Sequence, residues 1–408
     1  HALLPTEGVE PRFVAFQMST AASRFRSMAR GTTIPGITKR QLAEVGFHLP
    51  PTAAQHRIVA KLDDLFSELD AGVAALERAQ AKLDRYRASV LKAAVQGRLT
   101  EQWRQENSPS ETGQELLQRI LVERRRRWEE QQLAAFESKG KEAPKSWRDK
   151  YRDPVAPDTV GLPGLPDGWC WVSLDQLAAM VRNGLAKKPY TEPPGVPILR
   201  INAVRPMRVD LDEVRYYREK DADAARVFDG DLLFTRYNGS MDLLGVSGMV
   251  RGCSKRIVHP DKLILVRLVP AGPLREFVEI ASNHGASRLH VVKLARTTAG
   301  QVGVSGQDLK RMPIPLPSQD EQRAIVARVA ALLVGVAGCE TAIRGSQRRV
   351  PHLRQSILAH AFQGRLVPQD PNDEPASVLL ARIRAERESE AKKPRPKTKR
   401  PRKKAPSA

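Results

Sequence analysis

The chain has 408 residues, a length that suggests two or three folded units. Its net charge of +21 and pI of about 10.2 point to a polyanionic partner, most often nucleic acid. Three widely separated cysteines exclude a complete disulfide set and match no zinc-site spacing, and no run of 18 apolar residues occurs, so we expect a cytoplasmic protein without a metal site.

The first feature in chain order is one copy of an internal repeat. Residues 36–99 align without a gap on residues 303–366, and 19 of the 64 positions are identical. Similar blocks flank this alignment in the same order, which argues against chance. These blocks pair 13–14 with 277–278, 22–24 with 286–288, and 116–120 with 379–383.

Each copy of the repeat predicts a long helix with apolar residues at heptad spacing, which is typical of a coiled coil. Two separate amphipathic helices, each packed on its own domain, are the alternative interpretation. Pro351 should kink or break the second helix, because proline removes a backbone donor. The predicted seam consists of Leu62, Leu65, Leu69, Leu76, Leu83 and Tyr86 in the first helix, and Val329, Leu332, Val336, Ile343, Val350 and Leu353 in the second.

Local signals mark both ends of each long helix. The segments 52–55 and 318–321 resemble capping boxes, in which the first and fourth side chains bond each other's backbone N–H. Gly97 and Gly364 suit the left-handed residue that ends a helix.

The segment between the repeats changes character twice. Residues 102–166 are strongly charged, with an exposed helix expected over Leu116–Phe136 and a Pro/Gly/Lys-rich linker over Lys139–Leu165. Residues 168–310 contain short apolar runs separated by Gly, Pro, Asn and Asp, which predicts one α/β-type domain. The clearest expected strands are Pro197–Ile201, Asp231–Thr235 and Lys262–Leu268.

No catalytic constellation is present in the sequence. The chain lacks the Asn/Asp-Pro-Pro-Tyr/Phe run of amino-methyltransferases, a glycine-rich cofactor loop after a strand, and a phosphate-binding loop ending in Gly-Lys-Ser/Thr. These absences favour binding over catalysis.

The repeated order of motifs resembles the specificity subunits of type I restriction–modification enzymes. In each copy, Gly-Ile/Val-Thr/Ser precedes Leu-Pro, then Gln-x-x-Ile-Val, then a long helix ending in Gln-Gly-Arg-Leu. The opening Leu165–Trp169 and the internal Gly230–Arg236 are equally similar to that family. The resemblance covers nearly all of the chain except its basic tail.

This resemblance implies an α+β fold, in which α/β target-recognition domains are joined by long helices that form an antiparallel coiled coil. It implies a non-catalytic subunit that directs adenine methylation and DNA cleavage to a bipartite DNA site whose spacer the helices set. The implied partners are double-stranded DNA, two methyltransferase subunits and two restriction/translocase subunits. No cofactor is expected on this chain, because S-adenosylmethionine, ATP and magnesium belong to the partners.

The resemblance also gives the expected domain boundaries. A first recognition domain would begin about a hundred residues before His1, so we expect an N-terminally truncated chain. The expected parts are a remnant of that domain (1–30), the first repeat with its helix (31–100), the charged insertion and linker (101–166), the second recognition domain (167–312), the second repeat (313–367), a short helix (368–391) and a basic tail (392–408).

The candidate DNA-contacting residues are basic, amide and tyrosine side chains in turn-like stretches of the second recognition domain. Arg can bond guanine O6 and N7, Asn can bond adenine N6 and N7, and Lys mostly contacts phosphate, whereas each residue alone could equally be a solvated surface residue. The candidates are Arg182, Asn183, Lys187, Lys188, Tyr190, Arg200, Asn202, Arg205, Arg236, Tyr237 and Asn238, of which 236–238 follow an apolar strand and form the strongest cluster.

Two other functions are alternatives to this one. The chain could be a stand-alone DNA-binding scaffold or regulator without restriction partners, whereas an enzyme such as a fused methyltransferase is disfavoured by the missing motifs. The tail from Lys392 to Ala408 holds nine Lys/Arg and no acidic residue, and it fits a disordered extension and a loose DNA contact equally well.

Overall fold

The computed structural model describes residues 5–21, 25, 27, 37–218, 220–298 and 301–392. Residues 393–408 of the predicted tail (392–408) and the repeat block at 22–24 lie outside the described residues, whereas Lys392 is the last residue of a helix. The chain divides into two compact units, one formed by residues 1–81 and 339–408 and the other by 82–338. Helices and sheets occur together, as the expected α+β class requires.

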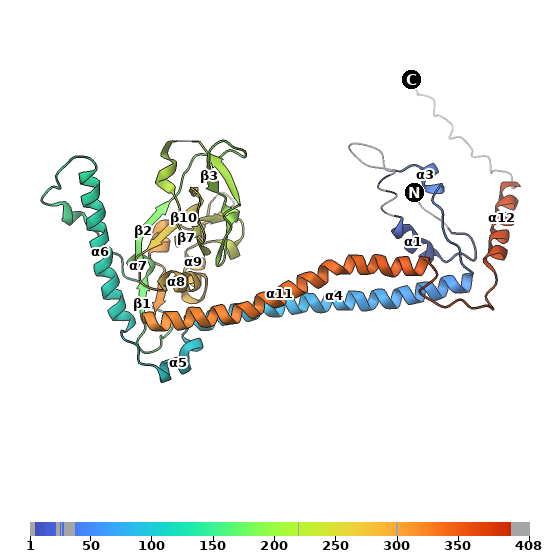
Figure 1. Ribbon diagram of the computed structural model, residues 1–408, viewed down its shortest axis with the longest axis horizontal. Coiled ribbons are helices and arrows are strands. Elements are labelled where there is room, and N and C mark those ends of the chain that lie inside the picture. The colour runs from blue at the N-terminus through green and yellow to red at the C-terminus, as the bar shows by residue number, and fades with distance from the viewer. Residues whose placement is uncertain are drawn as a thin grey trace, which may run out of the picture. The chain divides into compact units, whose positions relative to one another are not determined.

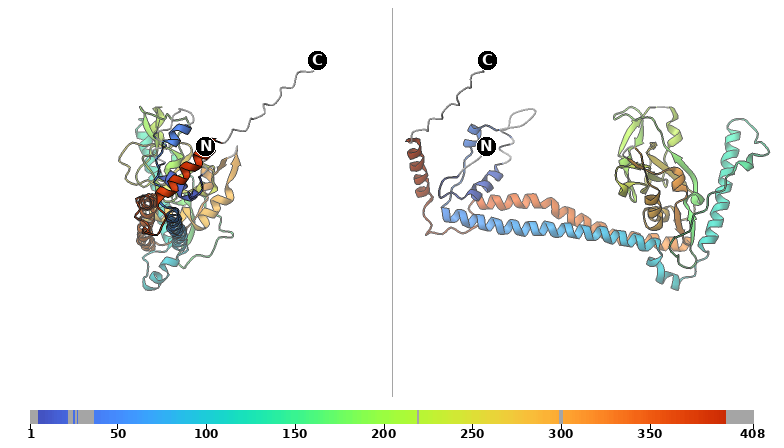
Figure 2. Two further views of the ribbon diagram at one scale, coloured as in Figure 1. Left: turned by 90° about the vertical axis from the view of Figure 1, so that its right-hand side faces the viewer. Right: turned by 180° about the vertical axis from the view of Figure 1, so that it is seen from behind.

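The first unit is helical in its described residues. Its core brings Phe13 together with Ile58, Leu62, Leu358 and Ala361. The first short helix therefore covers the paired ends of the two long ones (Figures 1 and 2). The helices are α1 (Pro11–Thr20), α3 (Lys39–Ala43), the first part of α4 (Thr52–Val95), the last part of α11 (Gln319–Phe362) and α12 (Ala376–Lys392).

The two long helices run antiparallel within each unit. In the first unit the Arg354 guanidinium lies 2.5 Å from the Asp70 carboxylate, so the end of α11 meets the first half of α4. In the second unit Val90 and Leu91 share a core with Ile325 and Val329, so the end of α4 meets the start of α11. This pairing contradicts the alternative of two separate amphipathic helices, each packed on its own domain.

Most of the predicted seam residues are buried or half-buried, but two of them are exposed. Leu62, Val329, Val336 and Ile343 are buried. Six others are half-buried, namely Leu65, Leu69, Leu76, Leu83, Leu332 and Val350. Tyr86 and Leu353 are 47% and 50% exposed, which contradicts their seam assignment. A helix with 3.6 residues per turn drifts by about 20° per heptad, so a strict heptad pattern rotates some members out of contact.

The expected break at Pro351 does not occur, because α11 continues through this residue to Phe362. Proline removes one backbone hydrogen bond, but Pro351 is exposed, so water can reach the carbonyl that loses its donor. Ile343 and Leu358 on either side are buried and hold the helix in place.

The two expected capping boxes are also only partly correct. Thr52 donates its hydroxyl to the Gly8 carbonyl and does not cap α4. Ser318 Oγ accepts from the Glu321 backbone N–H, but the Glu321 carboxylate accepts from Thr100, Arg104 and Trp169 instead of completing the box. The predicted helix stops are confirmed, since Gly97 and Gly364 have φ values of 69° and 71°.

The second unit is built on a four-stranded antiparallel sheet with the order β2-β10-β7-β9. Alternate residues serve two cores: Phe234 and Ile264 belong to one, and Leu233 and Leu265 to the other. Both faces of the sheet are covered, which explains why β7 and β10 consist mainly of apolar residues. The four strands are β2 (Ala178–Asn183), β7 (Leu232–Thr235), β9 (Ser247–Met249) and β10 (Leu263–Leu268).

Smaller sheets surround this centre. They pair β1 (Cys170–Ser173) with β13 (Pro313–Leu316), β3 (Val196–Leu199) with β6 (Val214–Tyr217), β4 (Val204–Arg205) with β5 (Arg208–Val209), and β11 (Arg296–Thr298) with β12 (Gln301–Gly303) and β8 (Tyr237–Asn238). Strands β3, β7 and β10 confirm the three expected strands. The helices of this unit are α5 (Glu101–Glu106), α6 (Gly113–Glu137), α7 (Leu174–Leu177), α8 (Leu274–Asn283), α9 (Gly285–Leu294) and α10 (Gly306–Lys310).

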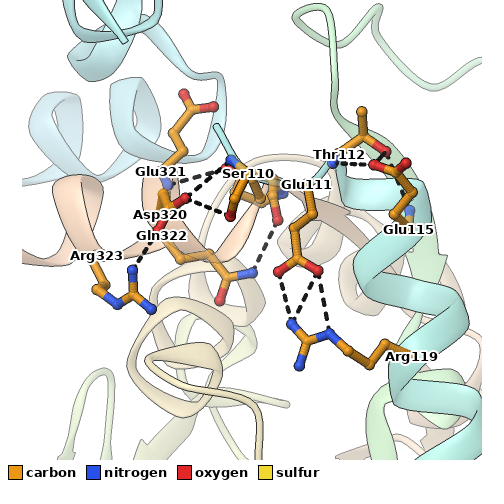
Figure 3. A network of polar contacts seen from close by, with 11 residues as sticks. Ser110, Glu111, Thr112, Glu115, Arg119, Asp320, Glu321, Gln322 and Arg323 are labelled. Atoms are coloured by element: carbon orange, nitrogen blue, oxygen red, sulfur yellow. Dashed lines mark hydrogen bonds and ion pairs between the residues drawn. The ribbon is translucent and has the colours of Figure 1, made fainter. Parts of the chain in front are cut away.

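Helix α6 confirms that a helix spans Leu116–Phe136, but the expected exposure is wrong at its start, where Leu116, Leu117 and Ile120 are buried in the core. The N-terminus of α6 is fixed to the start of α11. Ser110 donates to the Asp320 carboxylate from Oγ at 3.0 Å, and Arg119 bonds Glu111 (Figure 3). The segment 139–165 is more ordered than the expected linker. Trp147 is buried and stacks on Trp128 of α6 at 5.8 Å between ring centroids.

The sequence repeat is also a structural repeat. Gln55 donates to the Pro50 carbonyl at 2.9 Å, and its counterpart Gln322 donates to the Pro317 carbonyl at 3.0 Å. Both side chains are fully buried. A capping box begins α3 at Thr38, and the same box begins α10 at Ser305. The repeated residues therefore make repeated contacts.

Among the described helices, α11 has the length and apolar composition to cross a membrane. This is a weak indication, since helices packed inside proteins meet the same test. Helix α11 packs against α4 in both units.

Candidate nucleic-acid interface

The register of the central sheet brings candidate residues from two distant segments to one end. Strands β2 and β7 both run antiparallel to β10, and their last residues, Asn183 and Thr235, pair with Ile264 and Leu263. Arg182 and Asn183 therefore end β2 where the chain leaves β7 into Arg236. We call the surface formed by residues 182–183, 236–238 and 296 the strand-end surface.

Arg236 is held in place at this surface by its neighbours. Its backbone N–H donates to the Lys262 carbonyl at 2.9 Å, and its Nη1 donates to the Asp261 carbonyl at 3.4 Å. The guanidinium carbon lies 4.8 Å from the centroid of the Tyr237 ring, within the range of cation–π attraction. Its buried Nε has no hydrogen-bond partner among the described residues. The side chain is thus positioned while its Nη2 group makes no hydrogen bond within the described part of the chain.

A second small sheet carries Tyr237 and Asn238. Tyr237 pairs with Gly303 of β12, which in turn pairs with Arg296 of β11. A Cβ built on Gly303 would lie 2.7 Å from Cδ1 of Tyr237, so the ring lies directly against the glycine backbone. Asn238 Oδ1 accepts the Ser240 N–H at 3.0 Å, which fixes the orientation of its amide.

Arg296 was missed by the sequence analysis. It is exposed and is joined to Tyr237 through Gly303. The available signal was the short β-like run that precedes the repeated Gly-Val-Ser, which predicts a strand next to the repeat boundary.

The loop that follows β2 carries three more candidates, Lys187, Lys188 and Tyr190. It leaves the strand-end surface at Leu185, which forms a bridge with Pro260. Tyr190 forms a bridge with Tyr216, and the centroid of its ring lies 3.9 Å from the guanidinium carbon of Arg218.

The remaining candidates, Arg200, Asn202 and Arg205, belong to a different segment. Arg200 forms an ion pair with Glu213 at 2.5 Å, and Arg205 donates to the Val204 carbonyl at 2.9 Å. Among the described residues, no hydrogen bond or ion pair connects these three side chains with the strand-end surface. The structure therefore does not gather all eleven candidates into one group.

The acidic residue of the Gly230–Arg236 motif has a structural position. Asp231 is 2% exposed and accepts two bonds of 2.7 Å from the Arg267 guanidinium. It also accepts the Phe228 N–H at 2.8 Å. This carboxylate fixes the start of β7, and the other end of the strand leads directly into Arg236.

A buried histidine supports the loop after β2. His259 is fully buried, and its Nδ1 lies 2.8 Å from the Ala225 carbonyl. Burial lowers the pKa of this imidazole, so it is neutral near pH 7. Its backbone carbonyl accepts the Leu185 N–H at 3.0 Å.

The arrangement offers donors for base edges and cations for phosphates. Among the described residues, no group of three or more His, Cys, Asp or Glu side chains is placed to hold a metal ion.

Comparisons with known proteins agree on one family. Residues 1–77 match the family described as "Type I restriction modification DNA specificity domain". The chain is 31% identical over 398 residues to the EcoKI specificity subunit of Escherichia coli K12, covering 94% of this chain and 74% of that one. It is 25% identical over 390 residues to the Escherichia coli EcoDI specificity subunit, covering 93% and 77%.

A solved structure from work on the assembly of a type I restriction–modification system has a similar fold. The TM-score is 0.55 at 18% identity, and the match covers 88% of this chain and 72% of that one.

Proposed function

Because the chain belongs to the non-catalytic specificity subunits of type I restriction enzymes, we propose that its strand-end surface reads bases in one part of the DNA target. The observation that carries the proposal is the convergence of Arg182, Asn183, Arg236 and Asn238 at one end of a rigid sheet. Arg and Asn are the side chains best suited to guanine and adenine edges in the major groove.

The structural repeat supports recognition of a bipartite site. Helices α1 and α3 occupy the same places in the first copy as α8 and α10 in the second, where the recognition sheet is attached. Two copies of one attachment point suit two recognition elements, each contacting half of the target.

The chemistry of the complex belongs to its partners in this proposal. Two methyltransferase subunits supply adenine methylation with S-adenosylmethionine, and two restriction/translocase subunits supply ATP- and magnesium-dependent cleavage. The site of action is the cytoplasm, where the DNA and these partners meet.

The test changes the two side chains that follow β7. We expect Arg236→Ala and Asn238→Ala each to relax the methylated sequence at one or two positions, with a cost of about 1–3 kcal/mol at each position. Methylated sites would be mapped by sequencing the genome of a host that carries the chain with its modification subunit.

Arg208→Ala is the matched control, because this arginine lies in the same unit and its side chain is 72% exposed. It should leave the methylated sequence unchanged. Equal weakening at all sequences in the Arg236 and Asn238 variants would identify phosphate contacts and contradict base reading. Stable DNA binding with no methyltransferase in the purified complex would instead favour a stand-alone scaffold.

A further inference from the structure

A groove with no role in the proposed DNA contact lies in the second unit. Its volume is about 600 Å³, and it runs between the segment 155–163 and one face of helix α9. Two of its apolar side chains are unusually open: Val160 is 90% exposed and Leu289 is 69% exposed. Clustered exposure of large apolar side chains is typical of a surface that another molecule covers.

The wall formed by residues 155–163 is anchored at both ends. Val155 donates its N–H to Asp175 at 3.2 Å and accepts the Ser173 hydroxyl at 2.5 Å. The Pro163 carbonyl accepts the Trp171 indole N–H at 3.2 Å. The exposed Val160 therefore sits in the middle of a segment whose ends are tied to strand β1.

A local turn fixes the orientation of Val160 itself. Its N–H donates to Asp158 Oδ1 at 3.0 Å, and Leu162 donates to the Thr159 carbonyl at 3.2 Å. The side chain is thus presented to solvent by a defined backbone.

The opposite wall is a second face of α9. Ala286, Leu289, His290 and Lys293 are spaced by three or four residues, so they lie on one side of the helix. The buried side is already used, because Val291 is 1% exposed and Ser287 donates to the Pro313 carbonyl at 2.6 Å. His290 Nε2 also lies 2.9 Å from the Asp308 carbonyl, whereas Leu289 and Lys293 are exposed and are left open by the packing of the unit.

The rim of the groove is positively charged. Lys293 and Arg311 are exposed, and neither side chain has a hydrogen bond or ion pair within the described part of the chain. The acidic residue of the lining, Asp158, already accepts the N–H of Val160. The groove thus combines an apolar floor with unpaired cations.

We propose that this groove binds a segment of the modification subunit that places apolar side chains between carboxylates. The occupant rests on the proposed function, which supplies that partner. Charge complementarity at the rim favours an acidic protein segment, because opposite charges steer association and fix orientation. Bare DNA is a poorer fit, since phosphates gain nothing from contact with Val160 and Leu289.

The experiment measures the affinity of the full chain for the purified modification subunit by titration calorimetry. The double variant Val160→Ser/Leu289→Gln should weaken binding about tenfold or more. The charge-reversed variant Lys293→Glu/Arg311→Glu should also weaken binding and should remove part of its salt dependence. Val122→Gln is the matched control, because Val122 is 70% exposed on α6 and should be silent.

The outcomes separate the two proposals. If the unchanged chain forms no complex with the modification subunit, the proposed function fails and this occupant fails with it. If the complex forms and both groove variants bind as tightly as the control, the groove is not the docking site. Loss of DNA selection with an intact complex would assign the groove to DNA and overturn the inference. If the Val160→Ser/Leu289→Gln variant unfolds at a lower temperature than the unchanged chain, the affinity of the charge-reversed variant decides whether the groove is the docking site.

Discussion

At Gly303 the lack of a side chain determines where an aromatic ring can lie. An added Cβ would meet Cδ1 and Cε1 of Tyr237 at 2.7 and 2.8 Å, closer than real Cβ contacts allow. The ring in turn lies 4.8 Å from the guanidinium carbon of Arg236, and the Arg236 carbonyl accepts the Val304 N–H at 2.9 Å. Gly303 is therefore a positioning residue for the side chain proposed to read DNA.

Gly303→Ala should displace the Tyr237 ring and loosen Arg236. We expect the ratio of affinities for target and altered DNA to fall by between about 2-fold and 30-fold, the range of one cation–π contact. The measurement is competition binding with duplexes altered at single positions of the methylated sequence. Gly303→Ala/Tyr237→Ser removes the clash and should restore the melting temperature without restoring discrimination. Recovery of both would mean that the ring only fills space.

His284 gives the second unit a dependence on acid pH. Burial and the nearby Arg288 lower the pKa of this imidazole from 6.5 to about 4. The His284 imidazole is therefore protonated below about pH 6.5 in the unfolded chain, but only near pH 4 in the folded chain. The resulting stability is complete above pH 6.5 and is lost as the pH falls towards 4.

Urea unfolding at pH 7 and pH 5 measures this loss. The unchanged chain should lose up to about 1.4 kcal/mol per pH unit from this residue across the window. His284→Gln should be less sensitive to the same change in pH. An identical pH dependence in both proteins would show that the imidazole does not stay neutral in the folded state.

At the residue scale, the sequence predicted the position of a single side chain on its strand better than it predicted which side chains form one surface. Arg236 could be placed at a strand end because an apolar run precedes it, and the structure puts it there. That Asn183 lies at the same end depends on the pairing of β2 with β10, which joins segments far apart in the chain. Arg200 could not be separated from this group by residue type, and only its ion pair with Glu213 reveals its different setting.

At the scale of elements, the repeat predicted the helices more reliably than their contacts. The helices α4 and α11 have the same length of 44 residues and end at equivalent glycines. The helix that follows one copy of the repeat packs against the other copy. Helix α6 follows α4, yet Leu116 and Ile120 pack in a core with Leu316 of the second copy.

The first unit shows the same kind of contact between the two copies. Helix α12 follows α11, and its Leu379 lies against Gly8 beside the start of α4. Arg57 of α4 also bonds Asp373, just before α12, at 2.6 Å. Neither contact can be deduced from the repeat alone, because it requires the antiparallel pairing of the long helices. Heptad spacing predicts that a seam exists, but it predicts neither partner nor direction.

At the scale of the whole molecule, the charge divides between recognition and general attraction to DNA. Residues 393–408 contribute eight positive charges, so their deletion leaves a net charge of +13. Phosphate contacts release counterions and make binding salt-dependent, but they carry no sequence information. The strand-end surface and this stretch should therefore affect different observables.

Deleting residues 393–408 should weaken DNA binding at low salt and leave the methylated sequence unchanged. The plot of log affinity against log salt should become shallower by roughly 0.9 for each residue that neutralises a phosphate, and so by at most about 7. A variant of the same length with these Lys and Arg replaced by Gln separates charge from length, and it should behave like the deletion. An unchanged slope would mean that these residues do not contact DNA. A shifted target sequence would mean that recognition extends beyond the sheet, because counterion release alone cannot select bases.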